Sequence, residues 1–198
     1  MNSLSKKLAG AALSALLLAT CPSVHAAREV GGVRFEDKSR VADSELQLNG
    51  AGVRSRFFIN VYAIGLYLGE KKTNSGDTLA APGAKRLQLQ LLRDLTATQF
   101  VDALVESFHK NNDNADAEPL RSRLEELKAS MLSIGSARKG DVINIDWLPA
   151  QGMRLTLNGK AVGKDIGGEE FYRAMMKIWL GNRPVQDSVK DALLGKPQ

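Results

Sequence analysis

Apolar residues in the first half of the chain follow the patterns of β-strands. The stretch from Phe57 to Leu68 is almost continuously apolar, which predicts a central strand covered on both faces. Residues 87–91 alternate leucine with glutamine, so we expect a strand with one buried face. Shorter strands are predicted over 29–35 and 45–50, and we expect the run Gly50-Ala51-Gly52 to interrupt the second of them.

The period of the apolar residues then changes to that of α-helices. Thr96 and Gln99 have the spacing of a capping box, which predicts that a helix begins here. Leu95 and Phe100 flank the box as a hydrophobic staple. Apolar residues from 120 to 134 recur at helical spacing and predict a second helix.

Strand and helix patterns follow one another again in the last third of the chain. Residues 143–147 alternate as a strand. Asn158-Gly159 predicts the type I′ turn of a β-hairpin, because both residues accept positive φ angles. Two closing helices are predicted over 169–180 and 185–194. No repeat or linker divides the chain, so this order of elements predicts one α+β domain.

Residues 1–27 have the layout of a secretory signal peptide. Two lysines, Lys6 and Lys7, precede an apolar stretch over residues 8–18, and small residues come just before position 27. The apolar stretch is shorter than the roughly 20 residues with which a helix crosses a membrane. We therefore predict that the leader is removed, that residues 28–198 form the mature domain, and that the protein is periplasmic or secreted.

A minor alternative is a lipid anchor, because residues 18–21 faintly resemble a lipoprotein processing site at Cys21. Cleavage after Ala26 or Ala27 instead removes the only cysteine, so the mature chain would hold no disulfide. Cleavage also removes two lysines and lowers the formal net charge from +5 to +3. The remaining charges are scattered and mixed in sign, so we expect no nucleic-acid partner. No later stretch is apolar enough to predict a transmembrane segment.

The mature sequence offers few groups for metal or nucleophilic chemistry. His109 is its single histidine, and without cysteine a zinc site of the usual kind is not expected. Neither a nucleophile-elbow sequence nor a phosphate-binding loop occurs. We therefore predict no metal site and no cofactor.

Five segments of the sequence resemble the chalcone isomerase superfamily. They are Ala51 to Arg54 (AGVR), Val61 to Leu68 (VYAIGLYL), Leu95 to Phe100 (LTATQF) and the two closing helices. The resemblance implies an α+β fold with a large, mostly antiparallel sheet and helices packed on one face. It also implies two kinds of function, because the superfamily contains isomerases and non-catalytic members that bind fatty acids.

The resemblance to the isomerases extends to one of their catalytic residues. In those enzymes an arginine stabilises the negative charge that develops as a phenolate closes onto an enone, and Arg54 matches that arginine. Tyr62 stands where the isomerases have a threonine, Phe100 where they have a tyrosine, and Ser107 where they have an asparagine. Ile178 stands at a later threonine position. An intramolecular lyase of the chalcone isomerase type is therefore the alternative function, with Arg54 as its candidate catalytic residue.

The non-catalytic members hold a fatty-acid carboxylate with an arginine and a tyrosine that resemble Arg54 and Tyr62. A guanidinium binds a carboxylate through paired hydrogen bonds, a phenol adds a third donor, and apolar walls accept the tail. The preferred function is therefore binding of a fatty acid or a similar apolar carboxylate. The predicted ligand-binding residues are Arg54, Arg56, Tyr62, Phe100, Ser107 and Ile178.

Arg54 and Tyr62 can bind one carboxylate only if the fold brings them close together. On one straight strand Arg54 and Tyr62 would be about 26 Å apart, so we expect the chain to turn or bulge between them, within residues 50–56. Arg56 is the substitute if Arg54 does not face the ligand. The competing interpretation of both arginines is a surface charge at a sheet edge. A third function left open is an exported structural or partner-binding protein without a small ligand.

Overall fold

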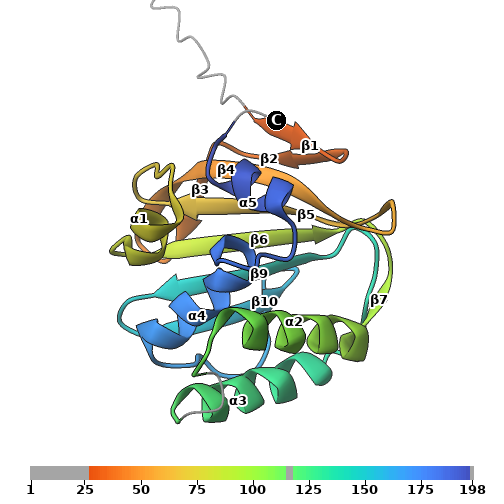
Figure 1. Ribbon diagram of the computed structural model, residues 1–198, viewed down its shortest axis with the longest axis vertical. Coiled ribbons are helices and arrows are strands. Elements are labelled where there is room, and N and C mark those ends of the chain that lie inside the picture. The colour runs from red at the N-terminus through yellow and green to blue at the C-terminus, as the bar shows by residue number, and fades with distance from the viewer. Residues whose placement is uncertain (1–26, 115–117, 197–198) are drawn as a thin grey trace, which may run out of the picture.

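A curled, seven-stranded antiparallel sheet forms the centre of the protein (Figure 1). The computed structural model describes residues 27–114 and 118–196. The strand order is β11-β10-β9-β6-β5-β4-β3, and every neighbouring pair is antiparallel. These strands are β3 (Lys38–Val41), β4 (Ser44–Arg56), β5 (Ile59–Leu68), β6 (Lys85–Leu91), β9 (Val142–Leu148), β10 (Gly152–Leu157) and β11 (Lys160–Ala161), and a separate pair joins β7 (Leu95–Thr96) to β8 (Ser136–Ala137).

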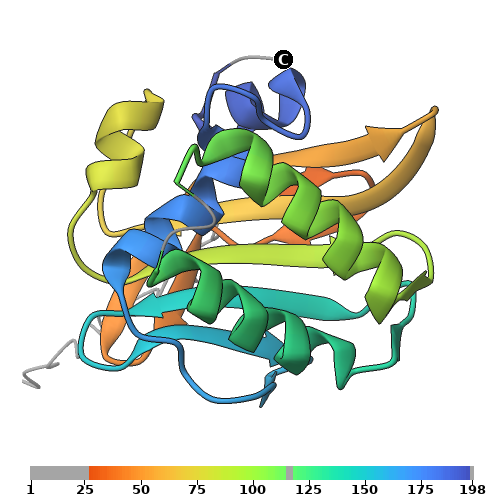
Figure 2. The same ribbon diagram turned by 60° about the horizontal axis from the view of Figure 1, so that its bottom comes forward.

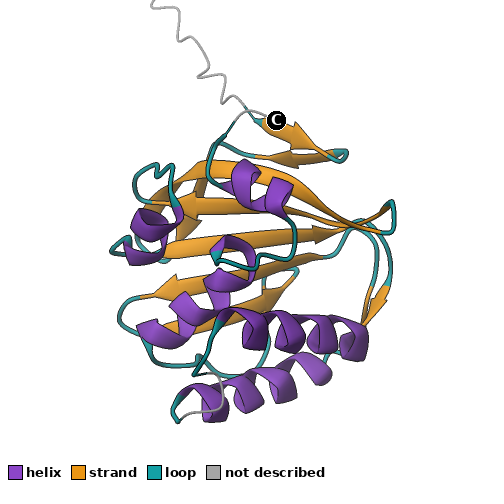
Figure 3. Ribbon diagram, in the orientation of Figure 1, coloured by secondary structure: helices purple, strands orange, loops and turns teal. Residues whose placement is uncertain are grey.

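Helices cover one face of this sheet (Figures 2 and 3). In the described residues they are α1 (Ser75–Ala80), α2 (Ala97–Asn111), α3 (Leu120–Leu132), α4 (Glu169–Leu180) and α5 (Asp187–Leu193). Helix α2 packs against α3 and α4, whereas α5 lies on β4. The predicted α+β fold, with a large antiparallel sheet and helices on one face, is confirmed.

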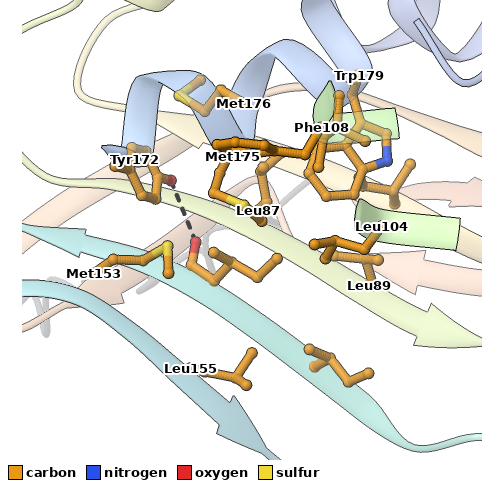
Figure 4. Close-up of a cluster of buried hydrophobic side chains, with 14 of the residues drawn as sticks. Leu87, Leu89, Leu104, Phe108, Met153, Leu155, Tyr172, Met175, Met176 and Trp179 are labelled. Atoms are coloured by element: carbon orange, nitrogen blue, oxygen red, sulfur yellow. Dashed lines mark hydrogen bonds between the residues drawn. The ribbon is translucent and has the colours of Figure 1, made fainter. Parts of the chain in front are cut away.

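The main core lies between the helices and the sheet. Alternate residues of β6, among them Leu87 and Leu89, are fully buried beneath the side chains of α4, including Trp179 (Figure 4). The hydroxyl group of Tyr172 finds a partner inside this core, because it donates to the carbonyl oxygen of Ile145 over 3.3 Å (Figure 4). Burial of the apolar face of each strand and helix provides the main driving force for the fold.

A small hairpin covers the opposite face of the sheet. It consists of β1 (Arg28–Val30) and β2 (Val33–Phe35), which pair antiparallel. We predicted one strand over residues 29–35, and this prediction is wrong. Gly31 and Gly32 both adopt positive φ angles, 59° and 75°, so the chain reverses between them.

Glycines within strands mark places where another element approaches closely. The ring of Phe35 lies over Gly65, where a Cβ atom would come within 2.7 Å of it, so β5 is covered on both faces over residues 62–68 as predicted. The predicted strand began too early, because residues 57 and 58 form a turn and residues 59 and 60 are exposed. Gly50 and Gly52 do not interrupt a strand, because β4 runs through both. A Cβ atom would lie 2.0 Å from the carbonyl oxygen of Ala192 at Gly50, and 2.8 Å from Ala192 Cβ at Gly52. Helix α5 therefore rests directly on the backbone of β4.

The predicted helix ends agree closely with the structure. The capping box forms, because Gln99 N donates to Thr96 Oγ1 over 3.2 Å and Thr96 N donates to Gln99 Oε1 over 3.1 Å. Helix α4 has the predicted bounds, α3 ends shortly before the predicted residue 134, and α5 begins shortly after the predicted residue 185.

The leader predicted over residues 1–27 lies outside the described residues, except for position 27. The alternative lipid-anchor site at Cys21 lies outside them as well. Among the helices that are described, none combines the length and the apolar character needed to cross a membrane.

Candidate functional site

A tight turn brings Arg54 and Tyr62 side by side. Strands β4 and β5 are joined by the two residues Phe57 and Phe58, and Arg54 pairs directly with Tyr62 across the two strands. The expected reversal between the two side chains is present, but the turn lies at Phe57 and Phe58, and within residues 50–56 the strand pairing has a bulge next to Arg54. Directly opposite residues in an antiparallel pair have Cβ atoms about 5 Å apart, so both can reach one ligand.

A β-bulge next to this pair adjusts which side chains face the helices. The register shifts between Arg54 and Ser55, because Ser55 pairs with Asn60 and leaves Val61 as an extra residue on β5. Bulges bend a strand and redirect its side chains, and they are frequent beside functional sites. Here the bulge leaves Tyr62 facing the main core between sheet and helices.

A cavity of about 440 Å³ lies at this end of the sheet, against helices α2 and α4. All the residues predicted from the sequence to bind ligand border it: Arg54, Arg56, Tyr62, Phe100, Ser107 and Ile178. Other apolar side chains, including Leu104 and Val185, complete its walls. The cavity is large enough for a small organic ligand, since such pockets range over about 300–1,000 Å³.

The phenol of Tyr62 is buried and neutral. Its oxygen accepts a hydrogen bond of 2.9 Å from Trp179 Nε1, and its ring meets the ring of Phe100 edge-on at 6.5 Å between centroids. Burial raises the pKa of Tyr62 to about 12, although the Trp179 hydrogen bond and the charge of Arg54 both lower it. The phenol therefore stays protonated near neutral pH, where its O–H can donate to a ligand but cannot serve as an efficient base.

Arg54 presents a positive charge without a carboxylate partner. Its Nη1 donates to Gln186 Oε1 over 3.2 Å and to the carbonyl oxygen of Ser55. The same Gln186 oxygen accepts the backbone N–H of Ser55 over 3.0 Å, so it holds the guanidinium and the strand together. Among the described residues Arg54 forms no ion pair, and its Nε and Nη2 groups donate no hydrogen bond. Part of the guanidinium is thus free to bind an anion.

The entrance of the cavity carries further charges that the sequence did not single out. Arg56 and Arg93 are exposed cations at its border, and Asp102 and Glu106 of α2 border it as well. Glu106 is already paired, because Lys110 Nζ lies 2.6 Å from its carboxylate and lowers its pKa. The balance of unpaired charge at the entrance is therefore positive.

Several residues of the site could not be recognised by local pattern. Trp179 has the spacing of a core residue in α4, and nothing in its neighbourhood indicates that its N–H reaches Tyr62. Gln186 is distant in sequence from Arg54, and Arg93 simply follows β6. All three become visible only when the strand order and the position of α5 are known.

Two positions that are polar in the isomerases carry apolar side chains at this site. Phe100 cannot donate a hydrogen bond, and Ile178 adds only apolar surface to the cavity. Tyr62 titrates too far from neutral pH for efficient acid or base catalysis. Within the described residues no cluster of three or more histidine, cysteine or acidic side chains could hold a metal ion. What this arrangement can do is bind an anion that carries an apolar group.

The antiparallel sheet, the helices on one face and the cavity between them define an α+β protein of the chalcone isomerase fold. Residues 27–195 match the family model described as chalcone isomerase-like. The chain therefore belongs to the chalcone isomerase-like family, as its sequence motifs predicted.

Comparison with solved structures supports the same fold. The crystal structure of a fatty-acid binding protein from Arabidopsis thaliana superimposes with a TM-score of 0.65 over 82% of this chain and 92% of that chain. The two sequences are 18% identical, so the likeness concerns the fold alone. No curated protein matches the sequence significantly.

Proposed function

We propose that the protein is a non-catalytic binding protein for a fatty acid or a similar apolar carboxylate. The observation that carries this proposal is the cation of Arg54, which has no carboxylate partner among the described residues and stands opposite the neutral phenol of Tyr62 at a largely apolar cavity. One solved structure with the same fold is that of a fatty-acid binding protein, which supports the proposal at the level of the fold.

In this proposal the carboxylate lies between Arg54 and Tyr62. The Nε and Nη2 groups of Arg54 donate to it, and the O–H of Tyr62 adds a third hydrogen bond while Trp179 supports the phenol from behind. The acyl chain extends into the cavity along Phe100 and Ile178. A partly dehydrated cation strengthens these hydrogen bonds, because charge-assisted bonds gain as water is removed.

Calorimetric titration of the delipidated protein with dodecanoate tests the proposal. We expect saturable binding, and Arg54→Gln should weaken it about 10- to 100-fold, because a hydrogen bond to a charged group contributes roughly 1.5–3 kcal/mol. Dodecanol, which has no carboxylate, should bind the wild type and Arg54→Gln alike. Equal dodecanoate affinities for these two proteins, or no binding at all, would contradict the proposal.

Arg154→Gln provides the matched control for this titration. Arg154 lies on β10 and already forms a two-pronged ion pair with Asp165, at 2.8 and 2.5 Å, so its loss should leave dodecanoate binding unchanged. If both arginine variants weaken binding equally, the effect reflects net charge and not the site.

The alternative function, an intramolecular lyase, makes a different prediction. An isomerase would remove the visible absorbance of a chalcone faster than buffer does, and Arg54→Ala would abolish that turnover. We expect no turnover from the wild type, because Phe100 has no proton to donate and the pKa of Tyr62 is about 12. Turnover that depends on Arg54 would replace the binding function by the enzymatic one.

We also propose that binding takes place outside the cytoplasm, in the periplasm or the medium. The proposal is supported by the leader pattern over residues 1–27. Cell fractionation with mass spectrometry of the exported chain tests it, and we expect an N-terminus at Ala27 or Arg28. A lipidated N-terminus at Cys21 would establish the anchored alternative, and a cytoplasmic chain that starts at Met1 would contradict export.

A further inference from the structure

Exposed apolar side chains gather at the turn between β4 and β5. Phe57 is 81% exposed, Phe58 is 105% exposed and Ile59 is 52% exposed, and they account for three of the four large hydrophobic side chains that are exposed among the described residues. We call residues 57–59 the hairpin tip. Figure 2 shows this turn reaching outward beyond the rest of the sheet. The clustering indicates an interaction surface, since scattered exposed apolar residues are ordinary but contiguous ones are not.

The backbone of the hairpin tip is unfavourable for the residues that it carries. Phe57 and Phe58 have φ angles of 49° and 65°, in the left-handed region that bulky side chains rarely adopt. The residues that suit such a two-residue turn are asparagine and glycine. This protein uses them in another of its two-residue hairpins, at Asn158 and Gly159 with φ angles of 51° and 78°. Two phenylalanines in this position therefore serve something other than folding.

The surroundings of the hairpin tip are positively charged. Arg56 lies with its guanidinium carbon 5.4 Å from the centroid of the Phe57 ring, and Arg93 is exposed at the same cavity entrance. Neither arginine forms an ion pair within the described residues. The acids at this entrance are Asp102 and Glu106, and the second is occupied by Lys110. Aromatic rings that protrude beside unpaired arginines match the boundary between the acyl chains and the headgroups of an anionic bilayer.

We propose that the hairpin tip docks the protein onto an anionic lipid bilayer. The rings of Phe57 and Phe58 enter the boundary between headgroups and acyl chains, and Arg56 and Arg93 lie against the negative headgroups. Because Phe57 also borders the cavity, docking places the cavity entrance at the membrane surface. The proposal rests on the exposed surface and does not require that the cavity holds a fatty acid.

The shape of the hairpin tip favours a membrane over a protein partner. Three side chains on a projecting two-residue turn form a point rather than a flat patch. A stable protein interface buries about 1,200–2,000 Å² in total, which such a point cannot supply alone. A bilayer can close around a small apolar wedge, and each ring that enters it is removed from water.

Vesicle flotation of the purified exported protein provides the main test. We expect the wild type to float with vesicles of phosphatidylcholine and phosphatidylglycerol. Phe57→Asn/Phe58→Gly should reduce the partition coefficient roughly 100-fold, because each phenylalanine contributes about a factor of ten. This variant carries the turn residues that the backbone prefers, so it should fold at least as stably as the wild type, and a loss of binding cannot be attributed to unfolding.

A fluorescent reporter locates the inserted residue. Phe58→Trp places an exposed indole at the hairpin tip, and the two native tryptophans, Trp147 and Trp179, are buried. We expect the emission of this variant to shift to shorter wavelength when anionic vesicles are added, whereas the wild-type emission stays constant. An unchanged spectrum in the presence of bound vesicles would show that another surface docks.

The charge contribution has its own matched pair of variants. Arg56→Gln should weaken binding to anionic vesicles about fivefold, since a cation near an anionic surface contributes about 1 kcal/mol. Arg40→Gln is the control, because Arg40 is exposed on β3, opposite Glu45 in the strand register and at the end of β4 away from the hairpin tip. On vesicles of phosphatidylcholine alone both variants should bind as the wild type does.

The remaining outcomes separate this proposal from the others. Phe58 does not border the cavity, so Phe58→Gly should lose about tenfold in vesicle binding and nothing in dodecanoate affinity. A wild-type protein that fails to float, or that floats equally well after Phe57→Asn/Phe58→Gly, overturns the proposal. So does a wild-type dimer, seen by light scattering, that the same double substitution dissociates without any vesicle binding, because the hairpin tip then contacts a second copy.

Discussion

Two of the hairpins in this protein have positive φ angles at both turn residues, but they carry opposite kinds of residue there. Asn158-Gly159, between β10 and β11, is the turn predicted from the sequence. The Asn158 side chain stabilises it further, because its oxygen accepts a hydrogen bond from Val142 N over 2.8 Å and its nitrogen donates one to Asp141 over 2.9 Å. Phe57-Phe58, between β4 and β5, has the same sign of φ at both residues and leaves both rings in water. The first turn stabilises the fold, whereas the second exposes two aromatic rings and strains the backbone to do so.

The arginines of the two hairpins differ in the same way. Arg154 on β10 is matched by the carboxylate of Asp165, so its charge is neutralised inside the chain. Arg54 on β4 has only the neutral oxygens of Gln186 and Ser55 as partners in the described residues. The β10–β11 hairpin pairs its arginine within the chain and so contributes to stability. The β4–β5 hairpin leaves one cation without an acidic partner and two aromatic rings exposed, and these groups are available to bind other molecules.

The strongest test of this comparison moves the unfavourable turn to the other hairpin. Asn158→Phe/Gly159→Phe should lower the free energy of unfolding by about 2–4 kcal/mol, because each left-handed bulky residue costs roughly 1–2 kcal/mol and the hydrogen bonds of Asn158 are lost. Urea denaturation measures the change. A stability equal to that of the wild type would show that the turn tolerates phenylalanine freely.

The next effect concerns the buried phenol, which only the β4–β5 hairpin has. The pKa of Tyr62 rises from 10.0 to about 12, so below pH 10 the phenol is protonated in both the folded and the unfolded chain. As the pH rises from 10 to 12 the unfolded tyrosine ionises first, and stability falls by about 2 kcal/mol. Tyr62→Phe should reduce this alkaline loss, as measured by urea midpoints below pH 10 and near pH 12.

The control for the alkaline experiment is Tyr67. Burial also raises the pKa of Tyr67 to about 12, and this residue remains in both proteins, so its contribution cancels. At neutral pH Tyr62→Phe is expected to be less stable than the wild type, because Trp179 Nε1 loses its acceptor. An alkaline loss that is identical in the two proteins would mean that Tyr62 is not the group responsible.

A smaller gain is expected when the favourable turn replaces the unfavourable one. Phe57→Asn/Phe58→Gly should raise the free energy of unfolding by about 1–2 kcal/mol, since the strain of two left-handed phenylalanines is relieved while glycine adds freedom to the unfolded chain. The urea midpoint measures it. A loss of stability instead would show that the rings support the fold and would remove the contrast between the hairpins.

The smallest expected effect is the difference in unfolding free energy between Arg154→Gln and Arg54→Gln, measured without ligand. Arg154→Gln should lower the free energy of unfolding by about 1 kcal/mol, because it breaks a two-pronged but partly exposed ion pair. Arg54→Gln should cost about half as much, since only hydrogen bonds to neutral oxygens are lost. The reverse order would indicate that Arg54 is a structural residue.

Local chemistry accounts for what the sequence predicted well. The capping box at Thr96, the bounds of α4 and the Asn158-Gly159 turn each depend on residues within a few positions, and all three predictions are confirmed. Gly50 and Gly52 were misread because their reason is α5, which lies far away in the sequence. The turn at Phe57 carries no local signal at all, since its residues are among the least suited to it.

The candidate site depended on a different kind of information. The predicted ligand-binding residues came from resemblance to a family, and their meeting at one cavity required the register of β4 against β5. The lack of an acidic partner for Arg54 is visible only in the folded structure, because acidic and basic residues are mixed along the whole sequence. Whether a charge is paired is decided by the strand order and not by its neighbours in the chain.

The contact between α5 and the backbone of β4 determines when, during folding, Arg54 is held in its final position. Gln186, immediately before α5, holds Arg54 from 132 residues away, and α5 is seated by Gly50 and Gly52. The Gln186 contact to the guanidinium therefore exists only when residues 186–193 are docked on the sheet. Under the proposed function, a chain that ends before residue 186 would lack the Gln186 contact to Arg54 and bind carboxylates less tightly, so a ligand would be accepted only after this segment has folded into place.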